Sequence, residues 1–139
     1  MASCYMTMPS QPDASAWVAK AEGDLGAAVL LFTHGEDTWE PVCFHCQQAA
    51  EKYLKAVLAA NKLETPKIHA LTRLIELQAA ILPELLEVET DAAWLSFSAV
   101  EMRYPLSAGL AVTRDHAERA LRIARQIKSI CQTHLSAVH

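Results

Sequence analysis

The sequence predicts an all-α protein, an up-and-down bundle of four main helices plus a short one. Ala, Leu, Glu, Lys and Gln, which favour helices, dominate the 139 residues, whereas the few β-branched runs leave little material for strands. Apolar residues recur at helical spacing in successive segments. Short connections between amphipathic helices favour antiparallel neighbours, which gives the bundle.

The first helix is expected to begin near Asp13 or Ser15, since either side chain can cap a helix, and to run to about Phe32. Its apolar face carries Trp17, Ala21, Leu25, Ala28 and Phe32. Asp24 falls within that face, where an unpaired carboxylate would be costly. A cationic partner for Asp24 is therefore expected.

The second helix is expected over about 41–61, because Pro41 suits an early helical position and no breaker follows it. Spacing divides this helix into two faces. One is an apolar arc made of Cys43, Cys46, Ala50, Tyr53, Leu54 and Val57. The other is a polar stripe made of His45, Gln48, Lys52 and Lys55, with Glu51 beside it.

The cysteines of this helix favour a structural role over a metal site. Cys43 and Cys46 have metal-like spacing, but the sequence has no second such pair and both residues fall on the apolar arc. A domain of this size needs no disulfide staples. We therefore expect reduced core thiols and no bound metal.

The remaining chain predicts three further helices. A short one is expected over 69–80, and Pro83 interrupts the chain after it. The next is expected from Asp91 to about Arg103, because Pro105 pushes Tyr104 out of the helical region. The last begins near Thr113, a good N-cap, and continues to about Leu135.

The charge and the N-terminus limit the classes of function. With a formal net charge of -4, the whole molecule has no field that would draw it onto nucleic acid or an acidic membrane, so any polyanion needs a local basic stripe. Residues 1–12 contain no Lys, no Arg and no long apolar run, which argues against a signal or membrane segment. We expect a disordered lead-in over 1–12 and one cytoplasmic domain over 13–139.

The stretch from Cys43 to Ala56, CFHCQQAAEKYLKA, is very similar to the second-helix signature of prokaryotic HEPN domains. The resemblance continues in the family's order with Asp24-Leu25, with Pro66 through His69 and Leu71, and with Arg103-Tyr104-Pro105. It implies a helical, usually dimeric domain, and we expect this chain to form a homodimer and to need no cofactor. Such domains are often encoded beside a minimal nucleotidyltransferase and act with it as a toxin–antitoxin pair or a nucleotide-binding module.

Many members of the family that this sequence resembles are metal-independent ribonucleases. In these, an Arg is followed by a polar residue and then by a His, with four to six residues between the Arg and the His. No Arg of this sequence is followed by a His at that spacing. We therefore expect nucleotide or RNA binding without turnover. A metal-independent ribonuclease is the first alternative, with His45, His69 and Arg103 as catalytic candidates. A non-catalytic module that pairs with a nucleotidyltransferase is the second.

Two sets of site residues follow from these patterns. His45, Gln48, Lys52 and Lys55 are the expected ligand-binding set, because lysines suit phosphate while histidine and glutamine can bond a base or ribose. The alternative is an ordinary solvated helix face. Asp24 and Arg103 are expected to form a bidentate structural pair, and His69 to cap or line the start of the third helix.

Overall fold

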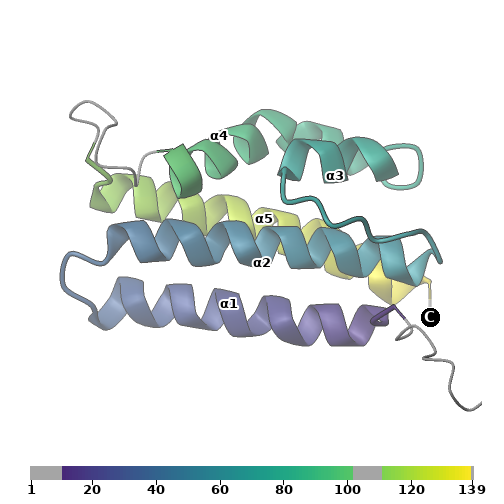
Figure 1. The fold of residues 1–139 in the computed structure, drawn as a ribbon, viewed down its shortest axis with the longest axis horizontal. Helices are drawn as coiled ribbons and strands as arrows, with labels where there is room; N and C mark the ends of the chain where they lie inside the picture. Colours follow the sequence, from purple (N-terminus) through teal and green to yellow (C-terminus); the bar gives the residue numbers. More distant parts are fainter. Residues whose placement is uncertain (1–10, 102–110, 139) are drawn as a thin grey trace, which may run out of the picture.

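A computed structural model of the protein describes residues 11–101 and 111–138. Within these ranges the chain forms helices and loops without a strand. The helices are α1 (Ala14–His34), α2 (Trp39–Ala60), α3 (Leu71–Gln78), the 3-10 helix η2 (Pro83–Val88), α4 (Glu89–Val100) and α5 (Arg114–Ala137). The predicted all-α bundle of four main helices and a short one is confirmed (Figure 1).

Side-chain caps fix where the two outer helices begin. The carboxylate of Asp13 accepts a hydrogen bond of 2.9 Å from the backbone N–H of Ala16, as the sequence predicted for an N-cap. At α5, Thr113 Oγ1 accepts from the backbone of His116, and the His116 ring bonds back to the N–H of Thr113. These bonds satisfy donors that a helix start otherwise leaves open.

Gly35 closes the turn between α1 and α2 by its lack of a side chain. Thr38 Oγ1 donates a hydrogen bond of 2.8 Å to the carbonyl of Leu31, and the backbone of Gly35 passes between these two groups. A Cβ on Gly35 would overlap both the Thr38 hydroxyl and that carbonyl. The short connection therefore depends on glycine at this position.

The region after α2 departs from the sequence-based boundaries. The third helix is shorter than the predicted 69–80, because His69 stays in the preceding loop, where its carbonyl accepts a hydrogen bond from Gln47. Pro83 begins η2 rather than only interrupting the chain, and η2 leads directly into α4. The Arg103-Tyr104-Pro105 segment lies outside the described residues.

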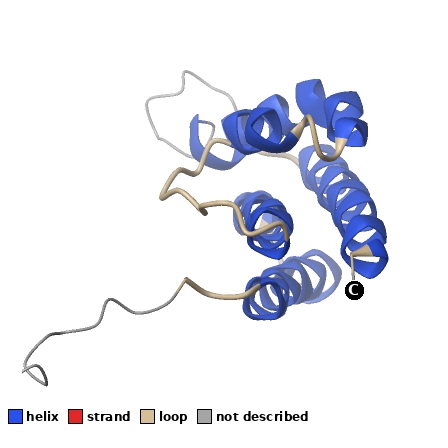
Figure 2. Cartoon of the chain, turned by 90° about the vertical axis from the view of Figure 1, so that its right-hand side faces the viewer, coloured by secondary structure: helices blue, strands red, loops and turns tan. Residues whose placement is uncertain are grey.

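The helix α2 lies at the centre of the bundle. It packs against α1 and α5 along its length and against α3 and α4 above them (Figure 2). Thirteen of its 22 residues are buried, so this one helix supplies much of the core. Three of those buried residues are polar or charged, namely Gln47, Glu51 and Lys55, and each needs a partner inside the protein.

Three buried cysteines belong to the same core. Cys43 and Cys46 on α2 and Cys131 on α5 are fully buried and unbridged, as the apolar arc predicted for the first two. Burial raises the pKa of the Cys43 thiol to about 11 and that of Cys131 to about 12, and it raises the pKa of Cys46 further. At neutral pH these groups are thiols rather than thiolates.

We expect the three core thiols to react with dithionitrobenzoate only when the protein unfolds, because the reagent attacks thiolates and neither ionisation nor access is available in the fold. The measurement uses a Cys4→Ser variant, since Cys4 lies outside the described residues. Native protein should release little chromophore, and denaturant should release it from all three thiols. Fast reaction of the native variant at mildly alkaline pH would contradict the burial of these side chains.

Candidate functional site: two carboxylate clusters on the central helix

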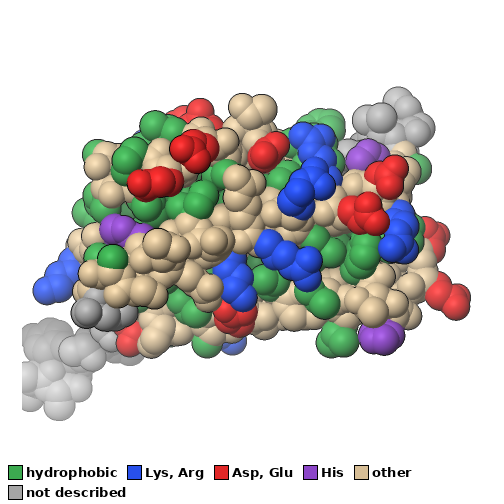
Figure 3. Space-filling view, turned by 180° about the vertical axis from the view of Figure 1, so that it is seen from behind, with side chains coloured by type: hydrophobic (Ala, Val, Ile, Leu, Met, Phe, Trp, Pro, Cys, Tyr) green, Lys and Arg blue, Asp and Glu red, His purple; other side chains and the backbone are tan. Residues whose placement is uncertain are grey.

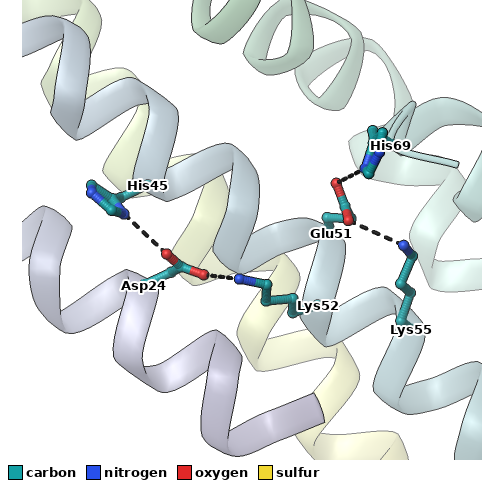
Figure 4. A network of polar contacts seen from close by, with 6 residues as sticks. All are labelled: Asp24, His45, Glu51, Lys52, Lys55 and His69. Atoms are coloured by element: carbon teal, nitrogen blue, oxygen red, sulfur yellow. Dashed lines mark hydrogen bonds and ion pairs between the residues drawn. The ribbon is translucent and has the colours of Figure 1, made fainter. Parts of the chain in front are cut away.

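The first cluster joins α1 to α2 through Asp24. His45 Nδ1 lies 3.0 Å from Asp24 Oδ1, and Lys52 Nζ makes an ion pair with Asp24 Oδ2 (Figure 4). The carboxylate is mostly covered, while the side chains of His45 and Lys52 remain 31% and 23% exposed. The cationic partner expected for Asp24 is therefore Lys52.

The second cluster joins α2 to the loop before α3 through Glu51. Lys55 Nζ and His69 Nδ1 each lie 3.1 Å from a different oxygen of the Glu51 carboxylate. The side chains of Lys55 and Glu51 are only 6% and 5% exposed, whereas that of His69 is 76% exposed. Lys55 Nζ also lies 5.4 Å from the ring centre of Trp17 on α1, within the range of a cation–π contact.

The two clusters share one chemical design. In each, an acidic side chain bonds a lysine through one oxygen and a histidine through the other (Figure 4). An ionised carboxylate only accepts hydrogen bonds, so the Nδ1 atom of each neutral imidazole must carry the proton. Nε2 of both His45 and His69 then keeps its lone pair and can accept a hydrogen bond or a proton.

The loop that carries His69 is held from a second direction. Gln47 Nε2 donates a hydrogen bond of 2.9 Å to the His69 carbonyl, one turn of α2 before Glu51. Backbone and ring of His69 are thus both tied to the central helix. The exposed imidazole is therefore fixed in place, and His69 does not cap α3 through its side chain.

The predicted polar stripe does not form one solvated face. Because α2 is enclosed by the other helices, Lys55 is buried with Glu51, and the interpretation of Lys55 as an exposed side chain is wrong. His45 and Lys52 both contact Asp24. Gln48, which lies between them in sequence, is half-buried. His69, which the sequence offered as a catalytic candidate or as a residue at the start of the third helix, has the most exposed side chain of the two clusters.

The proposed Asp24–Arg103 pair stays a prediction, because Arg103 lies outside the described residues, although Lys52 and His45 already occupy both oxygens of Asp24. The role of Glu51 was missed. Its spacing of four residues from Lys55 was the available signal, since such pairs face each other on a helix. Its bond to His69 joins residues 18 positions apart and no periodicity indicates it.

Neither a metal site nor a membrane-spanning helix is found in the part of the chain that the structure describes. Residues 11–101 and 111–138 contain no group of three His, Cys, Asp or Glu side chains that could hold a metal ion. No helix in these ranges is long and apolar enough to cross a membrane.

Comparison with known proteins identifies the family. The HEPN domain model matches residues 14–134, nearly the whole described chain, and the chain belongs to the HEPN-domain family. The fold is similar to the crystal structure of an archaeal HEPN homologue, with a TM-score of 0.72 and 22% identity, over 90% of this chain and 99% of that one. No curated protein matches the sequence.

A second crystal structure, of a protein from Thermus thermophilus, is similar to this chain with a TM-score of 0.71. The two chains are 29% identical, and the match covers 86% of this chain and 96% of that one. Both solved structures are matched over nearly their full length, so the described helices correspond to a whole fold in each.

Replacing Lys55 with alanine should destabilise the protein by about 3 kcal/mol, because the buried Glu51 carboxylate would lose its cation. Lys20→Ala on α1 is the matched control: this exposed lysine makes no ion pair within the described residues, and its loss should cost less than about 0.5 kcal/mol. Denaturant unfolding followed by circular dichroism measures both changes. In a cycle with Glu51→Gln the two losses should not add, and additive losses would show that the residues are not coupled.

Proposed function

We propose that this HEPN protein binds a nucleotide or RNA and acts with a minimal nucleotidyltransferase partner in a toxin–antitoxin or stress-response system. Family membership and the two histidines held beside α2, His45 on the helix and His69 in the loop before α3, support this proposal. The site consists of His45, Lys52 and His69 as ligand contacts. Lys55 holds Glu51, and Gln48 lies between His45 and Lys52 in sequence.

The observation that carries the proposal is the fixed orientation of His45 and His69. Each ring is held through Nδ1 by a carboxylate, and each leaves an acceptor nitrogen for a ligand. His45 and Glu51 are six positions apart on α2, or about 9 Å along the helix axis. Lys52 directly follows Glu51 in sequence and is still partly exposed, which adds a positive charge near a bound phosphate.

Partner binding is supported by exposed apolar side chains on the upper layer of the bundle. These side chains lie on α3, η2 and α4 and in the loop between the first two: Leu77, Ile81, Leu86, Phe97 and Val100. Apolar groups that gather on one layer are typical of protein interfaces. We assign this layer to association with a second copy of the chain or with the nucleotidyltransferase.

A His45→Ala, His69→Ala variant should bind fluorescent ATP analogues and a short single-stranded RNA at least tenfold more weakly than the native protein, since two contacts of about 1 kcal/mol each are lost. Anisotropy titrations measure this change. His34→Ala, which removes an exposed histidine at the end of α1, is the control and should bind normally. If the native protein bound neither probe, the interaction-module function would replace this proposal.

Ribonuclease activity is the second candidate, and the Glu51–His69 pair favours it. Nε2 of His69 is exposed and can take the proton of a ribose 2′-hydroxyl, whose oxygen then attacks the adjacent phosphorus. The P–O5′ bond breaks, a 2′,3′-cyclic phosphate forms, and the departing oxygen takes a proton from a second group. A chelator should not stop this reaction, because the step uses no metal.

If the protein cleaves RNA, His69→Gln should abolish cleavage and Glu51→Gln should slow it by about one hundredfold, the usual range for losing or misorienting a general base. Gel electrophoresis of labelled RNA incubated with excess protein and a chelator tests this, with His34→Ala as the unchanged control. RNA that stays intact with the native protein would remove the ribonuclease alternative. Intact binding with no cleavage would leave the binding function in place.

A further inference from the structure

The helix α5 carries a positive charge that the rest of the protein lacks. It contains five basic side chains, namely Arg114, Arg119, Arg122, Arg125 and Lys128, and two acidic ones, Asp115 and Glu118. Its formal charge is thus +3, and the rest of the chain carries -7 to give the net -4. A view of the face behind that of Figure 1 shows Lys and Arg side chains along its middle (Figure 3).

Three of the five cations on α5 are already neutralised. Arg114 pairs with Glu118, Arg119 with Asp91, and Lys128 with Glu22 on α1. The charges of these three side chains are therefore balanced by acidic groups of the protein itself.

Arg122 and Arg125 differ from the other three. Both are exposed, and neither forms an ion pair with any residue of the described ranges. Separated by three positions, they lie on one side of α5, about one turn apart. Two guanidinium groups are therefore free for an external anion.

These arginines line two hollows between α1 and α5 that meet at Arg125. One, of about 300 Å³, is lined by Phe32, Glu118, Leu121, Arg122 and Arg125. The other, of about 450 Å³, is lined by Leu25, Arg125, Lys128, Ser129, Gln132, Thr133 and Ser136. Together these hollows are called the groove, and its lining residues on α5 run from Glu118 to Ser136, about 27 Å of helical rise.

The lining of this groove combines two chemistries. Its first hollow pairs the arginines with the apolar surfaces of Phe32 and Leu121. The second hollow is lined by Arg125 together with the hydroxyls of Ser129, Thr133 and Ser136 and the amide of Gln132. Its acidic neighbours are engaged, because Glu118 bonds Arg114 and Glu22 bonds both Lys128 and Gln132.

We propose that this groove binds the phosphodiester backbone of a single-stranded RNA segment. The guanidinium groups of Arg122 and Arg125 contact successive phosphates, since planar forks match phosphate oxygens. Hydroxyls of the second hollow donate to phosphate or ribose. The negative charge of the remaining protein confines the polyanion to α5.

This inference rests on the proposed function and changes where the ligand is held. On α2, Lys55 is buried with Glu51, and the partly exposed Lys52 is paired with Asp24, so this helix offers a phosphate one lysine rather than two. The groove on α5 would hold the backbone of an RNA, and His45 on α2 and His69 in the loop before α3 would contact a different part of the ligand. The two sites are therefore tested by separate variants.

The test compares native protein with Arg122→Gln, Arg125→Gln in titrations with a fluorescent oligouridylate over a range of salt. We expect roughly tenfold weaker binding or more, because charge-assisted bonds to two phosphates are lost. The slope of log affinity against log salt should fall by about 1.4, the value for two contacts to a single strand. Thermal unfolding should be unchanged, since both side chains are exposed.

A Lys62→Gln, Arg73→Gln variant removes the same charge from exposed positions elsewhere and should keep native affinity and slope. Equal weakening in this control would overturn the proposal in favour of general charge attraction. Poly-glutamate binding as tightly as RNA, with the same arginine dependence, would overturn it in favour of an acidic protein segment.

The remaining outcomes separate the two sites. Loss of RNA binding in the His45→Ala, His69→Ala variant alone would overturn the groove and leave the proposed function standing. Loss in the arginine variant alone would support the groove and remove the α2 site. Native protein that binds no RNA would overturn the groove, while ATP binding would then still test the proposed function.

Discussion

The structure depends on the enclosure of α2. A helix that packs against four others leaves little of its surface to water, so its buried charges must be neutralised within the protein. Glu51 and Asp24 perform that neutralisation for Lys55 and Lys52, and in doing so they connect α2 to α1 and to the loop before α3. The contacts that neutralise the charges of α2 are thus also contacts that hold the centre of the bundle together.

The features that the sequence could predict are those that depend on nearby residues. Helix starts at Asp13 and Thr113 were predictable, because capping depends on residues only two or three positions away. The burial of Cys43 and Cys46 followed from their place on an apolar arc. Local chemistry and periodicity carry this information directly.

The burial of Lys55 was not predictable from spacing alone. A polar stripe on an amphipathic helix normally faces water, and nothing within α2 indicates that another element covers that stripe. The contacts of Glu51 with His69 and of Lys55 with Trp17 come from distant parts of the chain. The start of η2 at Pro83 was missed for a different reason, because proline both ends a preceding helix and suits the first position of a new one.

The separation of charge between α5 and the remainder of the chain also gives the molecule an electric dipole. A negatively charged molecule with one positive side experiences a torque in the field of a polyanion, which turns that side toward the polyanion before contact. Productive collisions are then enriched although the net charge opposes approach. Because this orientation acts over a Debye length of about 8 Å at physiological ionic strength, the association rate constant should vary with salt more steeply than the dissociation rate constant.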